Sequence, residues 1–369
     1  MPATGGTGGG NTTEPRAYPI YRAAGSHRQL GRLHGEQAGE QIQAHLALLY
    51  ETLGLSRDSF QKRALRFLPL FERHCLHLVE EIKGLGEGAG ITSAEALAVN
   101  VRSALGLEPD QGCTSFVVPG PATASGETLI GQTSDTLPSV MDFGYVLHLK
   151  PDDKPETLFW TFGGMIGYHG LNAAGVAQFA NDLGDGGPPP RFGLPHYPLK
   201  RLIMECSSMA GVIELFRKTP LSSNGNYVLC DGEGEILDVE ATTDGPEFLD
   251  DSDKGFIAHA NHFCSARHAT DENHRLSVAD SFPRQQRIEA LLEERLGSLT
   301  VEDLQGILRD DDNHPAGICR HPRSDNAADG FELAGQTVAA LIAEPAHGRL
   351  HVSYGPPCQN PFVTYTMDG

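Results

Sequence analysis

Apolar residues recur at helical spacing through the first hundred residues of the chain. The positions on this rhythm begin with Leu30, Leu33, Ile42, Leu46 and Leu49. The same spacing continues through residues 60–85. Thr92 and Glu95 then have the separation of a capping box, in front of the apolar stretch 96–101. We therefore expect roughly three helices before residue 105.

After residue 113 the pattern changes to short β-branched and apolar runs separated by turn residues. Residues 114–118 and 128–132 predict a hairpin across Ser125-Gly126. Residues 227–230 and 236–241 predict a second hairpin across the turn 231–234. Further strands are expected at 145–149, 157–162, 176–181, 256–260, 337–343 and 349–353.

At least two helices are expected to interrupt these strands. One begins at Pro198, and the other covers residues 282–296, with Ser281 as its cap and Pro283 in the tolerant first turn. Hairpins combined with segregated helices predict an α+β layered fold and disfavour a doubly wound parallel sheet.

Three parts of different composition follow one another along the chain. Residues 1–16 form a tail whose beginning is rich in glycine and threonine, and this tail is expected to be flexible. Residues 17–112 form a helical region, and residues 113–369 a strand-rich region. We expect the two long parts to form one folded domain.

Charge is distributed unevenly between the two long parts. The whole chain has 369 residues, with 28 Lys+Arg, 48 Asp+Glu and a formal net charge of −20. Residues 1–112 hold 11 basic and 12 acidic residues, so the remaining 17 and 36 give residues 113–369 a net charge of −19. This acidity argues against a general nucleic-acid binder, which needs basic surface to replace counterions on phosphate.

The sequence also bears on the compartment of the protein. No apolar run approaches the roughly 20 residues that span a bilayer. Residues 1–13 lack the basic start and apolar centre of a secretion signal. Seven widely spaced cysteines, an odd number, are more typical of free thiols than of a disulfide framework. We therefore expect a cytoplasmic protein that does not associate with a membrane.

Cys113 is the first candidate for chemistry, because it opens a predicted strand at the point where composition changes. Most cysteines are simply small buried apolar residues, and a nucleophilic cysteine needs a base or a cation beside it. Side chains of suitable type follow other predicted strands or begin a helix: Asp135, Asn181, Asn261 and Arg284. Amide groups can donate to an oxyanion, and arginine can stabilise negative charge. Each of these residues also has an ordinary structural explanation, as a turn former or a solvated side chain.

Two other kinds of site are disfavoured. The candidate zinc ligands have spacings that match no common metal motif: His262, Cys264, His268, His274, Cys319 and His321. The glycines of 163–167 spell neither a Walker loop nor a dinucleotide fingerprint. No metal and no cofactor are predicted.

Taken together, seven short segments in order resemble the isopenicillin N acyltransferase family over residues 31–362. They are Gly112-Cys-Thr-Ser-Phe116, Gly131-Gln-Thr-Ser-Asp135, Gly170-Leu-Asn-Ala-Ala-Gly175, Ala258-His-Ala-Asn-His-Phe263, Ser281-Phe-Pro-Arg284, Ile318-Cys-Arg-His-Pro322 and Tyr354-Gly-Pro-Pro-Cys358. This family belongs to the N-terminal nucleophile hydrolases and is related to bile-salt hydrolases and penicillin V acylases. The resemblance implies an αββα sandwich, in which two stacked antiparallel sheets are covered by helices.

The same resemblance implies self-cleavage between Gly112 and Cys113. The Cys113 thiol would attack the Gly112 carbonyl, and water would release the upstream chain. The new α-amine of Cys113, with a reference pKa of about 7.7–8.0, is suited to take the thiol proton. Nucleophile and base would then belong to one residue.

By the family's pattern, four further residues surround this nucleophile. Asp135 would orient the amine, Asn181 and Asn261 would lie around the oxyanion hole and the amine, and Arg284 would close the polar network. Two positions depart from relatives. Thr133-Ser134 replaces a pair such as Asn-Trp, and Gln132 stands where bile-salt hydrolases have arginine, so the shape and charge of the pocket differ there.

The expected activity is hydrolysis of an amide bond in a small acylated amine or peptide-like substrate, through a Cys113 acyl-enzyme. Acyl transfer from a thioester or amide donor to an amine, such as a β-lactam nucleus, is the alternative. An unprocessed binding or structural relative is a third hypothesis. The expected partners are a small acyl donor and the two cleaved chains with each other. A higher oligomer stays open.

Overall fold

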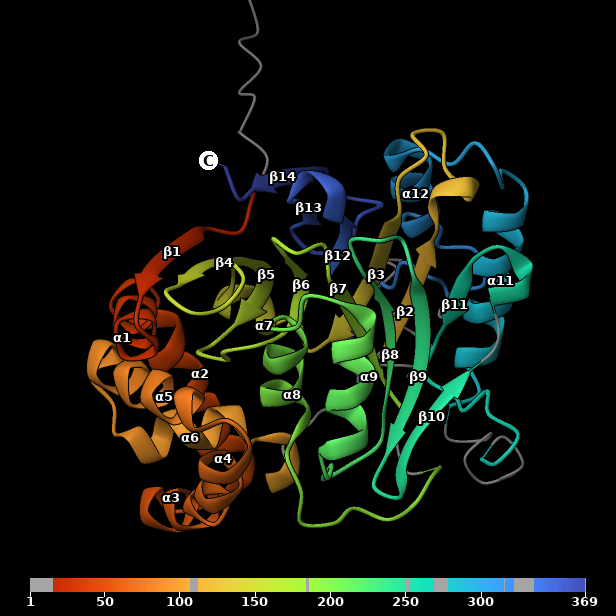
Figure 1. The fold of residues 1–369 in the computed structure, drawn as a ribbon. Coiled ribbons are helices and arrows are strands. Elements are labelled where there is room, and N and C mark those ends of the chain that lie inside the picture. The colour runs from red at the N-terminus through yellow and green to blue at the C-terminus, as the bar shows by residue number, and fades with distance from the viewer. Residues whose placement is uncertain are drawn as a thin grey trace, which may run out of the picture.

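Two β-sheets stacked on one another form the centre of the protein (Figure 1). The computed structural model describes residues 16–106, 112–183, 186–249, 252–268, 278–314, 316–321 and 335–368. The first sheet has the strand order β1-β4-β5-β6-β7-β8-β9-β10, and the second β11-β2-β3-β12-β13-β14.

Every neighbouring pair of strands is antiparallel except β1 and β4, which run parallel. The strands of the first sheet are β1 (Ile20–Gly25), β4 (Gly144–Pro151), β5 (Thr157–Phe162), β6 (His169–Asn172), β7 (Ala177–Asp182), β8 (Gly225–Cys230), β9 (Ile236–Thr242) and β10 (Gly245–Leu249). Those of the second are β2 (Gly112–Val118), β3 (Leu129–Thr136), β11 (Ile257–His259), β12 (Gln336–Glu344), β13 (Arg349–Ser353) and β14 (Phe362–Thr366).

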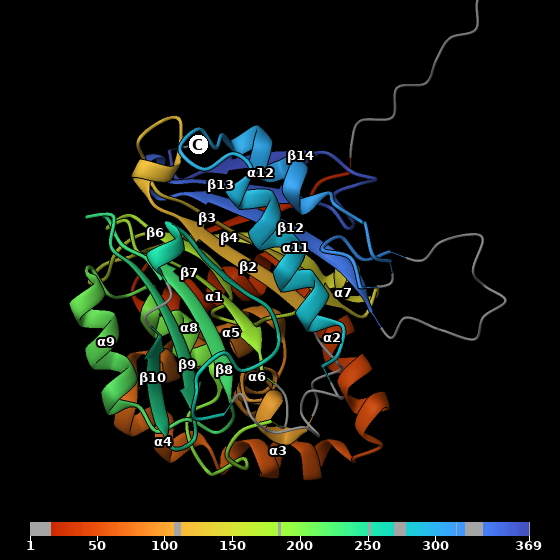
Figure 2. The same cartoon turned by 90° about the vertical axis from the view of Figure 1, so that its right-hand side faces the viewer.

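Helices cover both outer faces of the stacked sheets, as Figure 2 shows from the side. Helices α8 (His196–Ile203) and α9 (Met209–Lys218) lie against the first sheet, and α11 (Ser281–Glu293) and α12 (Val301–Leu308) against the second. The order of layers is therefore helix, sheet, sheet, helix. This is the αββα arrangement that the resemblance implied.

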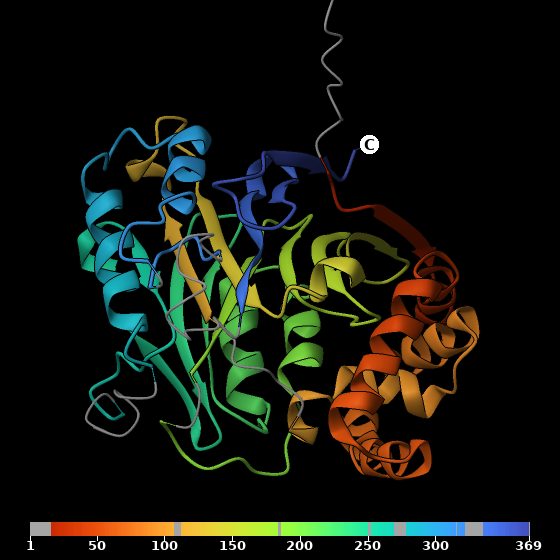
Figure 3. The same ribbon diagram turned by 180° about the vertical axis from the view of Figure 1, so that it is seen from behind.

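The remaining helices gather beside the edge of the first sheet that β1 and β4 form (Figure 3). They are α1 (His27–Gln37), α2 (Gly39–Leu53), α3 (Arg57–Leu65), α4 (Leu68–His74), α5 (Leu76–Ala89) and α6 (Ser93–Asn100), and the short α7 (Val140–Phe143) packs against α2. Short 3-10 turns cover Ser103–Leu105, Gly120–Ala122, Ser252–Lys254 and Pro345–His347.

Strand β2 shows how the layers are held together. All its residues are buried, and alternate side chains point to opposite faces of a sheet. Val117 joins the core between the sheets and the N-terminal helices, whereas Phe116 and Val118 join the core under α11 and α12. The strand is thus apolar on both faces from residue 116 on, and its chemistry is confined to its first residues.

Glycine lets helices α1 and α5 approach closely. Gly31 and Gly35 lie one turn apart on α1, and Gly84 and Gly88 one turn apart on α5. A Cβ added at Gly84 would lie 2.1 Å from the carbonyl oxygen of Arg28. The backbones touch where a side chain would otherwise separate them.

The ten strands expected from the sequence are all present, with small changes at their ends, and both predicted hairpins are confirmed. Four further strands, β1, β6, β10 and β14, were not predicted. One pair of strands departs from the antiparallel order that the resemblance implied, because β1 pairs with β4 in parallel. Short strands such as β1 obtain their backbone partners from distant sequence, and a local pattern does not reveal this.

The prediction of roughly three N-terminal helices was too low, because this region contains α1–α6. Gly54, in the left-handed conformation, ends α2, and Cys75, with non-helical dihedrals, separates α4 from α5. The capping box of Thr92 and Glu95 is confirmed at the start of α6.

Two details of the later helices also differ from expectation. Helix α8 begins at His196, two residues before Pro198. Ser281 is the first residue of α11 and does not cap it, because the cap position is Asp280. The Ser281 hydroxyl instead accepts a hydrogen bond from the backbone N–H of Asn261, 2.6 Å away.

All seven cysteines lie within the described residues and are free thiols. Across the described part of the chain, no helix is both long and apolar enough to cross a membrane.

Replacing Gly84 by alanine is expected to lower the free energy of unfolding by about 1–3 kcal/mol, the usual cost of overpacking. Gly306, inside α12, has no atom within 4 Å of an added Cβ. Gly306→Ala is therefore the matched control and is expected to be neutral or to stabilise by up to about 1 kcal/mol. Urea unfolding of both variants checks this, and equal effects would contradict the close packing of α1 on α5.

Acid is expected to weaken the packing of the N-terminal helices on the first sheet. Burial lowers the pKa of His34 to about 4 and that of His45 to about 3, while unfolded histidine keeps a pKa of about 6.5. The unfolded state thus binds more protons below pH 6.5, and stability falls by about 1.4 kcal/mol per pH unit for each histidine. Urea unfolding at pH 7, 6 and 5 measures this slope. An unchanged slope in His34→Gln would contradict the assignment.

Candidate functional site

The β2–β3 hairpin brings the first sequence-predicted residues together. Gly112 is paired with Asp135, and Cys113 with Ser134. Residues directly opposite one another share a face of the sheet. Cys113 therefore faces the space between the sheets, whereas Asp135 lies on the helix-covered face with Gly112.

Asn261 and Arg284 hold the main chain of Cys113 on both sides. The backbone N–H of Cys113 donates to Asn261 Oδ1 over 2.9 Å, and its carbonyl oxygen accepts from Arg284 Nη1 over 2.6 Å. Arg284 Nη1 also donates to Thr114 Oγ1 (2.8 Å), and Nη2 donates to Asn261 Oδ1 (2.7 Å). A single guanidinium thus joins residues that are far apart in sequence.

Local structure explains this placement. Arg284 lies in the first turn of α11, which packs on β2 and β11, and it is 1% exposed. Asn261 follows β11, whose residues pair with β2. The hydroxyl of Ser281, at the start of the same helix, fixes the Asn261 backbone.

A carboxylate and a second arginine surround the Gly112 backbone. Asp135 Oδ1 accepts from Thr337 Oγ1 (2.7 Å), and its Oδ2 lies 3.4 Å from Arg320 Nε. A Cβ at Gly112 would lie 2.8 Å from Arg320 Nη1 and 3.0 Å from Asp135 Oδ2. Only glycine lets this ion pair approach the peptide bond before Cys113 without displacement. Arg320 also pairs with Asp280, the residue before α11.

Asn181 reaches the site from the other sheet. Its Nδ2 donates to Ser115 Oγ (2.8 Å) and to the carbonyl oxygen of His259 (2.9 Å), and its Oδ1 accepts from Gln132 Nε2 (3.0 Å). These bonds connect β7 of the first sheet to β2, β3 and β11 of the second. Asn181 therefore bonds to Ser115, which lies two residues after Cys113 on β2, and not to Cys113 itself.

A small cavity of about 30 Å³ opens beside Asn181. It is also lined by Ala180, Asp182, His196, Tyr197, Lys200, Asn224 and Gly225. The Lys200 ammonium lies 3.2 Å from His169 Nε2 and over the ring of Tyr168. The space next to the site therefore has a buried cation in its wall.

Burial dominates the electrostatics of the thiol. Burial first, and the charge of Asp135 second, raise the pKa of Cys113 to about 12, against the lowering influence of Lys200 and Arg284. Burial also raises the pKa of Asp135, which Arg320 and Arg284 oppose. In the intact chain the thiol is therefore protonated at neutral pH, and its activation needs a base close to it.

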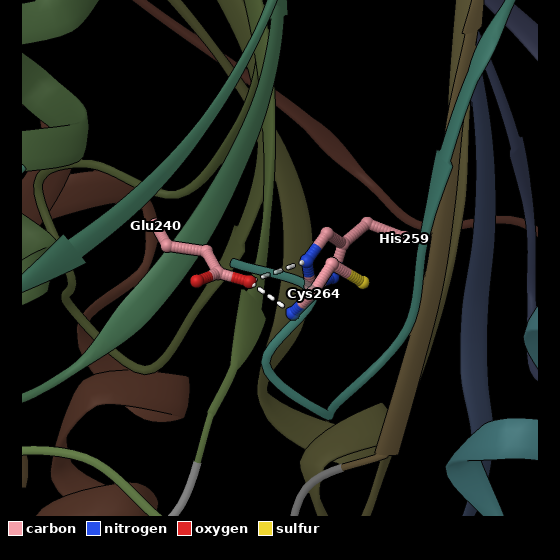
Figure 4. Close-up of side chains that lie close together, drawn as sticks. All are labelled: Glu240, His259 and Cys264. Carbon is pink, nitrogen blue, oxygen red and sulfur yellow. Dashed lines mark hydrogen bonds and ion pairs between the residues drawn. The ribbon is translucent and has the colours of Figure 1, made fainter. Parts of the chain in front are cut away.

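Three side chains with metal-ligating atoms lie together, as Figure 4 shows, and two of them belong to residues shortly before and after Asn261 in sequence. The ligating atoms of Glu240, His259 and Cys264 lie within 4.8 Å of one another. Glu240 Oε1 lies 3.4 Å from His259 Nε2, and it also accepts from the backbone N–H groups of Cys264 and Ser265. This oxygen is already bonded to the loop that follows Asn261, so the carboxylate fits a role in loop positioning.

The zinc ligands considered from sequence do not form one group in the described residues. His262 bonds to Ser281 and stacks on Phe282, His321 pairs with Asp311, and Cys319 contacts Cys358. His268 packs on the ring of Phe263. The remaining candidate, His274, lies outside the described residues.

Sequence reasoning missed several residues of this site. Arg320 occurs in one of the family-like segments, but nothing around it indicated a contact with Asp135. Thr337 and Ser115 resemble ordinary strand residues. Glu240 lies in a predicted strand, where the alternation of side chains indicates that a position is buried but not what it contacts. A search for buried charged positions within predicted strands would have singled out Glu240.

Replacing Glu240 by glutamine is expected to lower the free energy of unfolding by about 3–5 kcal/mol, because it removes the carboxylate that lies 3.4 Å from a buried imidazolium and accepts from two backbone N–H groups. Burial opposes the charged form of His259, yet Cys264, Asp238 and Glu240 together raise its pKa well above the usual value. Glu233→Gln, on an exposed turn, is the control and should change stability by less than about 0.5 kcal/mol. Urea unfolding at pH 7 measures both; equal stabilities would contradict the role of Glu240.

Comparison with known proteins places this geometry in context. The chain is similar to a mutant of the conjugated bile acid hydrolase from Clostridium perfringens, with a TM-score of 0.48 and 13% identity over 69% of this chain and 96% of that one. It is also similar to penicillin V acylase from Agrobacterium tumefaciens, with a TM-score of 0.40 and 12% identity over 71% and 80% of the two chains.

A family of known proteins matches residues 122–357, a segment that contains Asp135, Asn181, Asn261 and Arg284 and begins after Cys113. The segment is more than half of the chain. The protein therefore belongs to the acyl-coenzyme A:6-aminopenicillanic acid acyl-transferase family.

Proposed function

We propose that this protein is a self-processing amidohydrolase whose nucleophile is Cys113. The proposal depends on two hydrogen bonds to the main chain of that residue. Asn261 accepts a hydrogen bond from its N–H, and Arg284 donates one to its carbonyl oxygen. The backbone groups of a strand residue are usually bonded by neighbouring strands, whereas those of Cys113 are bonded by two buried polar side chains, beyond the point where β11 pairs with β2. Membership in a family of amide hydrolases and acyltransferases supports the same chemistry.

Processing begins with attack of the Cys113 sulfur on the Gly112 carbonyl carbon. A C–S bond forms, the C–N bond of the peptide breaks, and the nitrogen takes the thiol proton, which leaves residues 1–112 as a thioester on Cys113. The α-amine of Cys113 is free once this bond has broken, and water then hydrolyses the thioester, which frees the thiol and leaves a carboxylate on Gly112. Asp135 and Arg320 lie against this peptide, where they can position it and stabilise developing charge.

The new amine would act as the base that the buried thiol requires. Asn261 Oδ1, which accepts the backbone N–H in the intact chain, is placed to accept from the amine. Arg284 and Arg320 disfavour a further positive charge nearby, and so favour the neutral amine that can take the thiol proton. Asp135 offsets part of the charge of the two guanidinium groups.

In turnover, the thiolate attacks the carbonyl carbon of the substrate amide, the amine of the substrate leaves with a proton, and water hydrolyses the acyl-enzyme. We assign Asn181 to holding Ser115 and the His259 main chain, since its Nδ2 already donates to both. Lys200 in the wall of the adjacent cavity favours a substrate that carries a carboxylate near the scissile bond, as acylated amino acids do.

Acyl transfer is the second candidate, and the family's own description favours it. The first half-reaction is identical, and only the second acceptor, an amine in place of water, differs. The pairing of β1 with β4 and the packing of α1 against β4 support a further part of the proposal: the two products of cleavage stay associated.

Self-processing predicts two fragments of the purified wild-type protein on a denaturing gel, of 112 and 257 residues. Cys113→Ala should give one full-length band and no amidase activity, because it removes the attacking sulfur. Cys206→Ser, which changes a half-buried thiol in the segment between α8 and α9, should process normally. A persistent full-length wild-type band without thiol-dependent amidase activity would favour an unprocessed binding or structural protein and sink the proposal.

Hydrolysis and transfer are separated by supplying one acyl donor with and without an amine acceptor. A hydrolase should release free acid at a rate that the acceptor changes by less than about twofold, since water is the acceptor in both cases. Release that needs the amine, with an acylated amine as product, would assign the protein to acyl transfer. Liquid chromatography with mass detection distinguishes the two products.

A further inference from the structure

A pair of cysteines outside the proposed catalytic chemistry lies close enough to react. Cys319 precedes β12, and Cys358 lies in the segment between β13 and β14, 39 residues later. Their sulfur atoms are 3.3 Å apart. A disulfide has a sulfur separation of about 2.05 Å, so bond formation requires a closing movement of about 1.2 Å.

The two thiols differ in exposure and in their roles in the hydrogen bond between them. Cys358 is exposed and Cys319 is buried, so a dissolved oxidant reaches Cys358 first. Cys319 donates its S–H to Cys358 Sγ. This hydrogen bond and the nearby His321 lower the pKa of Cys358, while the same contact raises that of Cys319. The exposed sulfur is therefore the more readily ionised and the more nucleophilic of the pair.

We propose that Cys319 and Cys358 are a modification site at which a hydroperoxide forms a reversible disulfide. The Cys358 thiolate attacks the terminal oxygen, the O–O bond breaks, and Cys358 becomes a sulfenic acid. Cys319 sulfur then attacks Cys358 sulfur, the S–O bond breaks, and the hydroxide leaves as water with the Cys319 proton. With hydrogen peroxide, two thiols and one peroxide give one disulfide and two waters; two electrons from a dithiol restore the thiols.

The Cys319–Cys358 disulfide would form next to the candidate functional site and would involve none of its proposed catalytic residues. Arg320, which pairs with Asp135, follows Cys319 directly, and its backbone N–H donates to Thr337 Oγ1 over 2.9 Å. A disulfide would fasten this segment to the strand pair β13–β14. The proposal is independent of the proposed function, because neither thiol takes part in the acyl transfer steps.

Differential alkylation with peptide mapping tests the site. Wild-type protein and Cys113→Ala are treated with a small excess of hydrogen peroxide, alkylated, digested, and compared before and after reduction. A linked peptide pair containing Cys319 and Cys358, lighter by two hydrogen atoms, is expected in both and should disappear on reduction. It should be absent from Cys358→Ser and unchanged in Cys264→Ser, which removes another exposed thiol.

Thermal unfolding supplies a second measurement. Oxidised wild type should melt a few degrees higher than its reduced form, because a cross-link across 39 residues restricts the unfolded chain. Cys358→Ser should show no such rise. The proposal is overturned if both thiols stay alkylatable after peroxide treatment, if the linked pair joins other cysteines, or if oxidation leaves the melting temperature of the wild type unchanged.

Discussion

The buried guanidinium of Arg284 is the interaction on which the arrangement of the site depends. Placing an unpaired charge in a protein interior costs several kcal/mol, and burial lowers the pKa of this arginine. The cost is offset because the group donates to the Cys113 carbonyl oxygen, to Thr114 and to Asn261. Removing any one acceptor would leave a buried charge with fewer partners. The start of α11, the end of β11 and the start of β2 are therefore fixed relative to one another.

The pleat of the second sheet then divides the chemistry between two faces. Cys113 points into the space between the sheets, where Asn181 bonds to Ser115, while Gly112 and Asp135 share the face that α11 covers. In the proposed mechanism, the Cys113 thiol meets a substrate on one face, while Asp135 and two arginines lie against its main chain from the other. The absence of a side chain at Gly112 is part of this division, because a Cβ would meet Arg320 and Asp135.

Much of the fold followed from local pattern. The ten expected strands, the β2–β3 hairpin and the capping box before α6 depend on alternation, turn residues and short-range spacing. What local pattern did not predict depends on partners distant in sequence. Strand β1 is short and pairs with β4, more than a hundred residues away. Serine is a residue type that commonly caps helices, yet the Ser281 hydroxyl accepts a hydrogen bond from the backbone N–H of Asn261.

The same distinction holds for the site. Residue types at strand ends, together with the family resemblance, singled out Asp135, Asn261 and Arg284, which the structure brings to Cys113 or Gly112. Asn181 was also singled out, but it bonds to the neighbours of Cys113. Arg320 and Glu240 were missed, because a charged residue in a loop or strand shows its role only when its buried partner is known.

Chemical labelling of an N-terminal cysteine tests the central claim most directly. A nitrile reagent such as 2-cyanobenzothiazole condenses with an adjacent amine and thiol, and not with an internal cysteine. The account predicts one equivalent of label on a fragment that begins at Cys113, with loss of amidase activity in proportion. Active enzyme that carries no such label, or a labelled fragment that begins at another residue, would contradict it.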